Sequence, residues 1–438
     1  MWELFSYGII SLWLEMAGMQ TIGQDTVAIL KWQAGLPQLI SPENSDQILA
    51  VSADKYLESL AAQGLLTADA QGIWMQSELR PLYNKNGTVP MPGASLTKIA
   101  TSLAALSTWG PQHQFETSIG TTGPITNGIL RGDLVITGGS DPHFVWEEAI
   151  ALGNTLQKLG INQVTGNLVI VGDFWMNYES DPIVAGQLLR EGINSATWSA
   201  NVRNIYYRMP PGTPQPQVTI AGSVISQKSI PKAIPIIQHK SLPLVYILKT
   251  MNVESNNDLA EILAKNLGGA KVVQEKAAWA AGVPQVEVQL INGSGLGVEN
   301  QLSPRAVTAM LMAIQRFLQT YEWFVADLFP VSGYDQGTLA DQSRNIPQGS
   351  VVKTGTLNDV IALAGVIPTR EQGLVWFTMI NRSPYWEATR AEQDKFLQQL
   401  VSEWGITKAS RVITPQINGN RLGLGASDRN QILREIGK

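Results

Sequence analysis

Ser95 and Lys98 stand three positions apart at the start of an apolar run. Ile99 and Leu103 continue that run at helical spacing as far as Gly110, which predicts a buried helix. Positions i and i+3 lie on one helix face, so the hydroxyl and the ammonium are expected to meet. An amine beside a hydroxyl in a site with little water can activate a nucleophile without histidine.

The same serine-lysine spacing also begins at Ser52 and at Ser229, so the spacing alone does not select a site. Ser52 is predicted to be the N-cap of an exposed helix, a position that serine favours. The third pair encloses Pro231, which predicts a linker. Ser95 differs because small residues precede it and an apolar helix follows it.

Two further short motifs carry polar groups suited to catalysis. Ser255-Asn256-Asn257 precedes a predicted helix, and Lys353-Thr354-Gly355-Thr356 ends a β-rich run. The alternative for the first motif is an ordinary helix start, which serine and asparagine favour. The alternative for Lys353 is an exposed charge at a strand end. Ser-x-Asn also occurs elsewhere in the chain, whereas Lys-Thr-Gly occurs once.

The composition excludes several classes of function. The 438-residue chain contains no cysteine, which excludes disulfides, thiol catalysis and thiolate metal sites. A net charge of −5 without a long basic run argues against nucleic-acid binding. Its three scattered histidines disfavour a zinc site, while a Ser-His-Asp triad, which needs one histidine, stays open.

The first 22 residues allow two interpretations. Leu4 to Leu14 is mostly apolar and has the length of a signal-peptide core, but the first lysine is Lys31 and Glu15 interrupts the run. One interpretation is an amphipathic helix packed on the protein. The other is an atypical export signal or a membrane anchor.

The pattern of elements changes after Gly110. Strands predicted at Phe115–Thr121 and Ile129–Thr137 open a strand-rich stretch that also contains a predicted helix at Trp146–Leu159, and several helical patterns follow after Leu242. Residues 172–217 show weak periodicity, and 230–235 resemble a linker. The predicted divisions are a hydrophobic N-terminal segment (1–22), a main domain in two parts (23–117 and 241–410), an inserted domain (118–240) and an extended tail (411–438).

The three motifs together carry a family resemblance. Ser-x-x-Lys, Ser-Asp-Asn and Lys-Thr-Gly form the motif set of serine β-lactamases and penicillin-binding proteins. This chain has all three kinds in that order, with Asn256 in place of the aspartate. Over about residues 45–405 it resembles the penicillin-binding protein 4 type of D-alanyl-D-alanine carboxypeptidase/endopeptidase, the class C low-molecular-mass group. The resemblance is carried by Pro92–Lys98, Gly132–Leu134, Gly138–Pro142, Glu254–Glu261, Asn292–Leu296 and Lys353–Thr356.

The resemblance implies an α+β fold. A serine β-lactamase/transpeptidase-like domain would place helices around a five-stranded antiparallel sheet, with a strand-rich domain inserted after the Ser95 helix. The separation of Ser95 from Ser255 exceeds what the bare domain needs but falls short of the longest family members. One inserted domain is therefore expected, with a second, nested one reduced or missing.

The resemblance also implies a role for each motif residue. The pKa of Lys98, the general base, would be lowered by burial and by Lys353. The roles are acyl nucleophile for Ser95, general base for Lys98, proton relay for Ser255, substrate amide contact for Asn257, carboxylate binding for Lys353 and Thr354, close backbone approach for Gly355, and oxyanion N–H donors from Ser95 and Thr356.

The activity implied is that of a serine-type D-Ala-D-Ala carboxypeptidase acting on peptidoglycan stem peptides, with endopeptidase activity on cross-links as a second reaction. β-Lactams would be covalent inhibitors, and no cofactor or metal is required. Export to the periplasm or cell envelope follows from the substrate, with peripheral membrane association through the N-terminal segment. The alternatives are a β-lactamase and a non-catalytic envelope-binding protein of the same fold.

Overall fold

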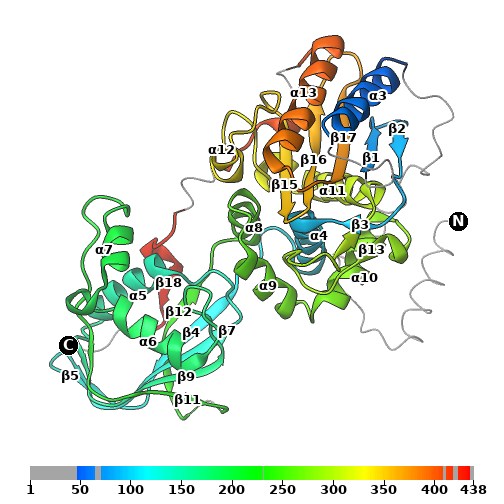
Figure 1. Ribbon diagram of the computed structural model, residues 1–438. Helices are drawn as coiled ribbons and strands as arrows, with labels where there is room; N and C mark the ends of the chain where they lie inside the picture. The colour runs from blue at the N-terminus through cyan, green and yellow to red at the C-terminus, as the bar shows by residue number, and fades with distance from the viewer. Residues whose placement is uncertain (1–46, 65–70, 230, 408–410, 418–422, 435–438) are drawn as a thin grey trace, which may run out of the picture.

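The computed structural model describes residues 47–64, 71–229, 231–407, 411–417 and 423–434. These residues form two lobes, one containing the strands β15, β16 and β17 and the other containing β4, β7 and β9 (Figure 1). The predictions for residues 1–22 lie outside the described residues. Within the described ranges, none of the helices combines the length and the apolar character that crossing a membrane demands.

The first lobe is built on a five-stranded antiparallel sheet, as predicted. Its strand order is β15-β16-β17-β1-β2, so strands from both ends of the chain pair side by side. The strands are β1 (Gln71–Gln76), β2 (Pro81–Lys85), β15 (Val351–Leu357), β16 (Val360–Pro368) and β17 (Leu374–Arg382).

Helices cover both faces of this sheet. Successive side chains of a strand point to opposite faces, and Ala362 and Ala364 of β16 pack into one cluster while Leu363 packs into the other. The helices on the first face are α4 (Thr97–Trp109), α8 (Leu244–Val253), α9 (Asn257–Asn266), α10 (Ala270–Ala281) and α11 (Pro304–Gln319). Those on the second are α3 (Gln47–Ala62) and α13 (Trp386–Trp404).

Short elements complete the first lobe. A three-stranded sheet joins β13 (Val288–Gln289), β14 (Gln301–Leu302) and β3 (Met91–Pro92) in the order β13-β14-β3. A short helix, α12 (Thr338–Asp341), precedes β15. The prediction that Ser52 caps a helix is wrong, because α3 begins earlier and Ser52 is buried within it.

The second lobe holds most of the chain between the two parts of the first. Its main sheet has six strands in the order β11-β9-β7-β4-β12-β18, and a smaller sheet has the order β10-β8-β6-β5. The strands are β4 (Glu116–Thr121), β5 (Ile125–Thr126), β6 (Ile129–Leu130), β7 (Leu134–Gly139), β8 (Gln163–Val164), β9 (Leu168–Asp173), β10 (Thr219–Ile220), β11 (Val224–Gln227), β12 (Ile234–Lys240) and β18 (Asn430–Ile432).

Several sequence-based details of this lobe differ from the structure. Helix α5 (Trp146–Lys158) was expected, but α6 (Pro182–Gly192) and α7 (Ala200–Tyr206) lie within the stretch of weak periodicity. Each is capped by a side chain, Asp181 or Ser199, that accepts backbone N–H groups. The linker prediction is wrong from residue 234 onward, because β12 begins there and pairs with β4.

The tail is extended but docked. Ile413 and Ile417 are buried in the core of the first lobe. Further on, Asn430–Ile432 pairs as β18 with β12 in the second lobe, where the red end of the chain lies (Figure 1). The tail therefore contacts both lobes. The predicted domain boundary at 118 falls inside β4, which begins at Glu116.

Candidate active site

Ser95 lies in a short 3-10 turn, η2 (Ala94–Leu96), directly before α4. Because residues i and i+3 eclipse in a 3-10 helix, this turn brings its side chain over Lys98. The Nζ of Lys98 lies 3.0 Å from Ser95 Oγ. Ser95 is half-buried and can be reached from solvent, whereas Lys98 is fully buried. The sequence therefore predicted this contact correctly.

Lys98 has two other hydrogen-bond partners, and both accept only. Its Nζ donates to Asn257 Oδ1 at 2.7 Å and to the backbone oxygen of Ser294 at 2.8 Å. A neutral amine that keeps these two bonds has its lone pair left for Ser95. The bond to Lys98 also orients the Asn257 amide, with its nitrogen free to donate to a substrate carbonyl.

Lys353 forms the second half of the site. Its Nζ donates to Ser255 Oγ at 2.9 Å and to the backbone oxygen of Thr354 at 2.8 Å. Ser255 has a φ of +53°, a left-handed backbone conformation that non-glycine residues rarely adopt. Asn256, where the motif set has aspartate, caps α9 by accepting the N–H of Leu259. The residue that caps the helix is therefore Asn256, and not Ser255 or Asn257, for which the helix-start alternative was considered.

The edge position of β15 frees backbone donors for the site. The N–H of Val352 donates to Pro330 O, away from the partner strand β16. Because N–H groups alternate in direction along a strand, those of Thr354 and Thr356 also point away from β16. The N–H of Thr356 is therefore available to a substrate oxygen, as an oxyanion donor must be.

Two glycines allow the backbones around Ser95 to approach closely. A Cβ on Gly355 would lie 3.1 Å from the Gly93 oxygen and 3.2 Å from Ala94 Cβ. Gly295 has a φ of +86°, and a Cβ there would lie 1.9 Å from the Ala94 oxygen. The first glycine keeps β15 against η2, and the second keeps the turn that carries the Ser294 carbonyl in place.

Burial dominates the electrostatics of both lysines. Burial lowers the pKa of Lys98 to about 7, and the carboxylate of Glu261 opposes this shift. The pKa of Lys353 is lowered well below its ordinary value, first by burial and then by the ammonium of Lys98. The expected repulsion between the lysines therefore acts on Lys353, while burial by itself accounts for the lowered pKa of Lys98.

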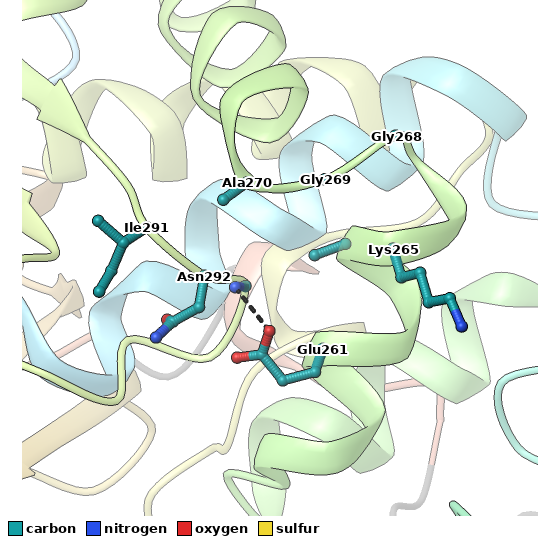
Figure 2. A pocket seen from close by; sticks show the side chains of 9 residues that line it. Glu261, Lys265, Gly268, Gly269, Ala270, Ile291 and Asn292 are labelled. Atoms are coloured by element: carbon teal, nitrogen blue, oxygen red, sulfur yellow. Dashed lines mark hydrogen bonds between the residues drawn. The ribbon is translucent and has the colours of Figure 1, made fainter. Parts of the chain in front are cut away.

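Glu261 is a functional candidate to which sequence reasoning assigned no role. Its carboxylate accepts the N–H groups of Gly293 at 3.1 Å and Ser294 at 2.9 Å. Figure 2 shows this carboxylate pointing to the turn that follows Asn292, beside a cavity of about 430 Å³. Glu261 thus holds the turn whose Ser294 carbonyl binds Lys98. Its position four residues after Asn257, on the same helix face, was the available signal.

The second lobe contacts the loop that carries Ser255. Tyr178 hydrogen-bonds to Asn256 through its side chain, and its hydroxyl lies 3.1 Å from His143 Nδ1. Asn266 at the end of α9 donates to the Ser140 oxygen at 2.8 Å. The inserted strands therefore support the site from the side of α9.

The sheet, the helices on its two faces and the Ser95 and Lys353 clusters at the edge strand define a penicillin-binding, β-lactamase-like serine enzyme fold. The family model for D-Ala-D-Ala carboxypeptidase 3 (S13) matches residues 53–182 and 215–402, which is more than half of the chain. The chain therefore belongs to this family of serine peptidases.

Individual relatives agree with the family. A D-alanyl-D-alanine carboxypeptidase of Actinomadura sp. (strain R39) is 24% identical, over 83% of this chain and 85% of that protein. The structure of the peptidoglycan endopeptidase Bd3459 of Bdellovibrio bacteriovorus matches with a TM-score of 0.66 and 21% identity, covering 79% of this chain and 96% of that one. One structure of Bd3459 is acylated by penicillin G. Penicillin-binding protein 4 of Haemophilus influenzae matches with a TM-score of 0.59 and 18% identity, covering 80% and 99%.

Proposed function

We propose that the chain is a D-Ala-D-Ala carboxypeptidase that cleaves peptidoglycan stem peptides through an acyl-enzyme on Ser95. The observation that carries the proposal is the hydrogen bonding of Lys98. Its two acceptor-only partners, Asn257 and Ser294, direct the lone pair of the neutral amine at Ser95. With a pKa near 7, about half of the Lys98 side chains are unprotonated at neutral pH, and the unprotonated fraction rises above it.

In the proposed reaction, Ser95 Oγ attacks the carbonyl of the penultimate D-alanine while Lys98 takes the hydroxyl proton. The N–H groups of Ser95 and Thr356 stabilise the oxyanion, each worth about 3 kcal/mol. Ser255 passes a proton to the leaving amine, supported by Lys353 at 2.9 Å. D-Alanine leaves, and water then hydrolyses the ester on Ser95.

Asn257 and Thr354 position the substrate in this scheme. The amide nitrogen of Asn257 donates to a backbone carbonyl of the peptide. Thr354, with Lys353, lies where the terminal carboxylate would bind. β-Lactams, which resemble the D-Ala-D-Ala end, would acylate Ser95; the relative Bd3459 is known in a form acylated by penicillin G.

Labelling with a fluorescent penicillin tests the nucleophile. The wild-type protein is expected to carry a covalent label that Ser95→Ala abolishes. Ser229→Ala is the matched control, because Ser229 begins a Ser-x-x-Lys pair but is exposed in the second lobe. A label that survives Ser95→Ala would refute the proposed nucleophile.

Purified muropeptides separate the candidate activities. Release of D-alanine from pentapeptides indicates the carboxypeptidase, and conversion of cross-linked dimers to monomers indicates the endopeptidase. Rapid loss of the penicillin label without a muropeptide product would favour the β-lactamase. Absence of any Ser95-dependent label would favour the non-catalytic envelope-binding protein.

The proposed substrate places the protein outside the cytoplasmic membrane. We therefore propose export to the periplasm or cell envelope, with residues 1–22 as signal or anchor. We also propose the predicted division into a two-part main domain and an inserted domain, with the first boundary moved to the start of β4 at Glu116. Cell fractionation tests the location: recovery of the native protein only from the cytoplasm would contradict it.

A further inference from the structure

The face of β15 next to α13 carries a cation that the mechanism above does not use. Thr354 and Thr356 lie two residues apart and so point to the same face of the strand. Arg390 of α13 donates from Nη2 to Thr356 Oγ1 at 2.9 Å. Thr354 Oγ1 lies 3.3 Å from the hydroxyl of Thr338 in α12. Two hydroxyls and a guanidinium thus gather beside the expected carboxylate position.

The charge of Arg390 is not neutralised by a bound carboxylate. Among the described residues, no acidic side chain lies within ion-pair distance of Arg390, although the carboxylates of Glu387 and Asp394 act on it from farther away, and its buried Nε has no hydrogen-bond partner. The neighbouring Arg344 differs, since Asp394 accepts its Nη2 at 2.6 Å and its Nε at 2.9 Å. Arg390 therefore has a charge and a donor left for a ligand.

Space for rearrangement lies next to this guanidinium. A cavity of about 590 Å³ extends between α12 and α13 and is lined by Arg390, Arg344 and Glu387, among others. Arg390 therefore borders open space on the side of this cavity, while its Nη2 reaches Thr356, which does not line the cavity.

The chemistry of the substrate calls for such a cation. A peptide ending in D-Ala-D-Ala carries a carboxylate one residue beyond the scissile bond. The Nζ of Lys353 already donates to Ser255 Oγ at 2.9 Å and to the backbone oxygen of Thr354 at 2.8 Å, so at most one of its hydrogens is left for a carboxylate. A guanidinium keeps its proton far more firmly and can bind a carboxylate through two parallel hydrogen bonds.

We propose that Arg390 is a specificity-determining residue that binds the terminal carboxylate of the peptide together with the hydroxyls of Thr354 and Thr356. This inference rests on the proposed carboxypeptidase function. It predicts a preference for free acids over C-terminal amides, and it assigns that preference to α13, outside the three sequence motifs.

A pair of synthetic peptides tests the assignment. Both end in D-Ala-D-Ala, one as the free acid and the other as the C-terminal amide. In the wild-type enzyme the acid is expected to react faster. Arg390→Gln should lower kcat/KM for the acid about 10- to 100-fold, mainly through KM, and leave the amide nearly unchanged. Arg390→Lys, which keeps the charge but not the paired donors, should recover part of the loss.

Arg382→Gln is the matched control, because Arg382 pairs with Asp359 in an exposed ion pair near the end of β17. Arg382→Gln should leave kcat/KM unchanged for both the acid and the amide. Equal losses for acid and amide in Arg390→Gln would mean that Arg390 only positions Thr356, and no loss would mean that it has no role; either result overturns the assignment. A wild-type enzyme that releases no product from the acid would overturn the proposed function, and this inference with it.

Discussion

Lys98 of α4 and Lys249 of α8 are both fully buried lysines on neighbouring helices, and each has three oxygen acceptors. The partners of Lys249 are the backbone oxygens of Ala326 and Phe329 and the carboxylate of Asp335 at 2.7 Å. Lys98 has a hydroxyl, that of Ser95, where Lys249 has the carboxylate.

This single difference separates a structural lysine from the proposed general base. Burial lowers the pKa of both side chains, but at Lys249 the carboxylate that opposes the shift, Asp335, is bonded directly to the amine. At Lys98 the opposing carboxylate is that of Glu261, which is not bonded to the lysine. Glu261 instead accepts an N–H of the turn whose Ser294 carbonyl binds Lys98. Burial is common to both lysines, so it does not by itself make a lysine a base. The third hydrogen-bond partner, a hydroxyl at Lys98 and a carboxylate at Lys249, distinguishes them.

The largest effect is expected at Lys98, where a substitution should nearly abolish acylation and leave the fold intact. Lys98→Met removes the amine but keeps much of its volume, so acylation by penicillin should fall by about 1,000-fold or more. The thermal unfolding midpoint should stay close to that of the wild type. Acylation at the wild-type rate would show that another group takes the proton from Ser95.

The opposite outcome is expected at Lys249. Lys249→Met leaves the Asp335 carboxylate buried and unpaired, which should reduce the free energy of unfolding by about 3–5 kcal/mol. Acylation per folded molecule should be retained. Urea denaturation and penicillin labelling measure the two effects.

A double variant controls for the cause of this loss. Lys249→Met combined with Asp335→Leu removes both charges and should recover most of the stability. An equally unstable double variant would assign the loss to packing rather than to the unpaired charge.

The pH dependence of acylation tests the role given to Lys98 and the effect of Glu261 on its pKa. Below its pKa Lys98 is protonated and has no lone pair, so the acylation rate should rise with pH and reach half its maximum at about pH 7. In Glu261→Gln the ammonium loses a stabilising negative charge, so the pKa falls and the midpoint moves to lower pH.

A charge variant elsewhere is the control for Glu261. Glu275 of α10 is exposed, and Glu275→Gln should leave the pH profile unchanged. Stopped-flow experiments between pH 5 and 9 measure the rate of penicillin acylation for the wild type and for both variants. A midpoint that moves to higher pH in Glu261→Gln would contradict the electrostatic role given to this carboxylate.

The smallest expected effect concerns the backbone approach at Gly355. The added methyl of Gly355→Ala would meet the Gly93 oxygen at 3.1 Å and Ala94 Cβ at 3.2 Å, so β15 must move by a few tenths of an ångström. Acylation should fall on the order of tenfold, a fraction of the worth of one oxyanion donor, with little change in unfolding midpoint. Unchanged acylation would show that the spacing between β15 and η2 does not matter.

The sequence alone indicated the parts of the site that depend on local spacing or on fixed motifs. The contact of Ser95 with Lys98 follows from their spacing of three residues in a helical turn, and the helix end at Gly110 follows from the Gly110-Pro111 pair. Ordered motifs also predicted the five-stranded sheet, since they led to a family whose fold the structure matches.

Tertiary structure decided the rest, because the partners are far apart in the chain. No local pattern shows that the Ser294 carbonyl accepts a hydrogen bond from Lys98. Nor does one show that Glu261 accepts the N–H of Ser294 and so fixes the turn. The same holds for β18, which pairs with β12 across nearly two hundred positions, and for Arg390, which reaches Thr356 only because α13 packs on the sheet. Backbone carbonyls and strand edges carry no residue-type signature, so their roles appear only once the chain is folded.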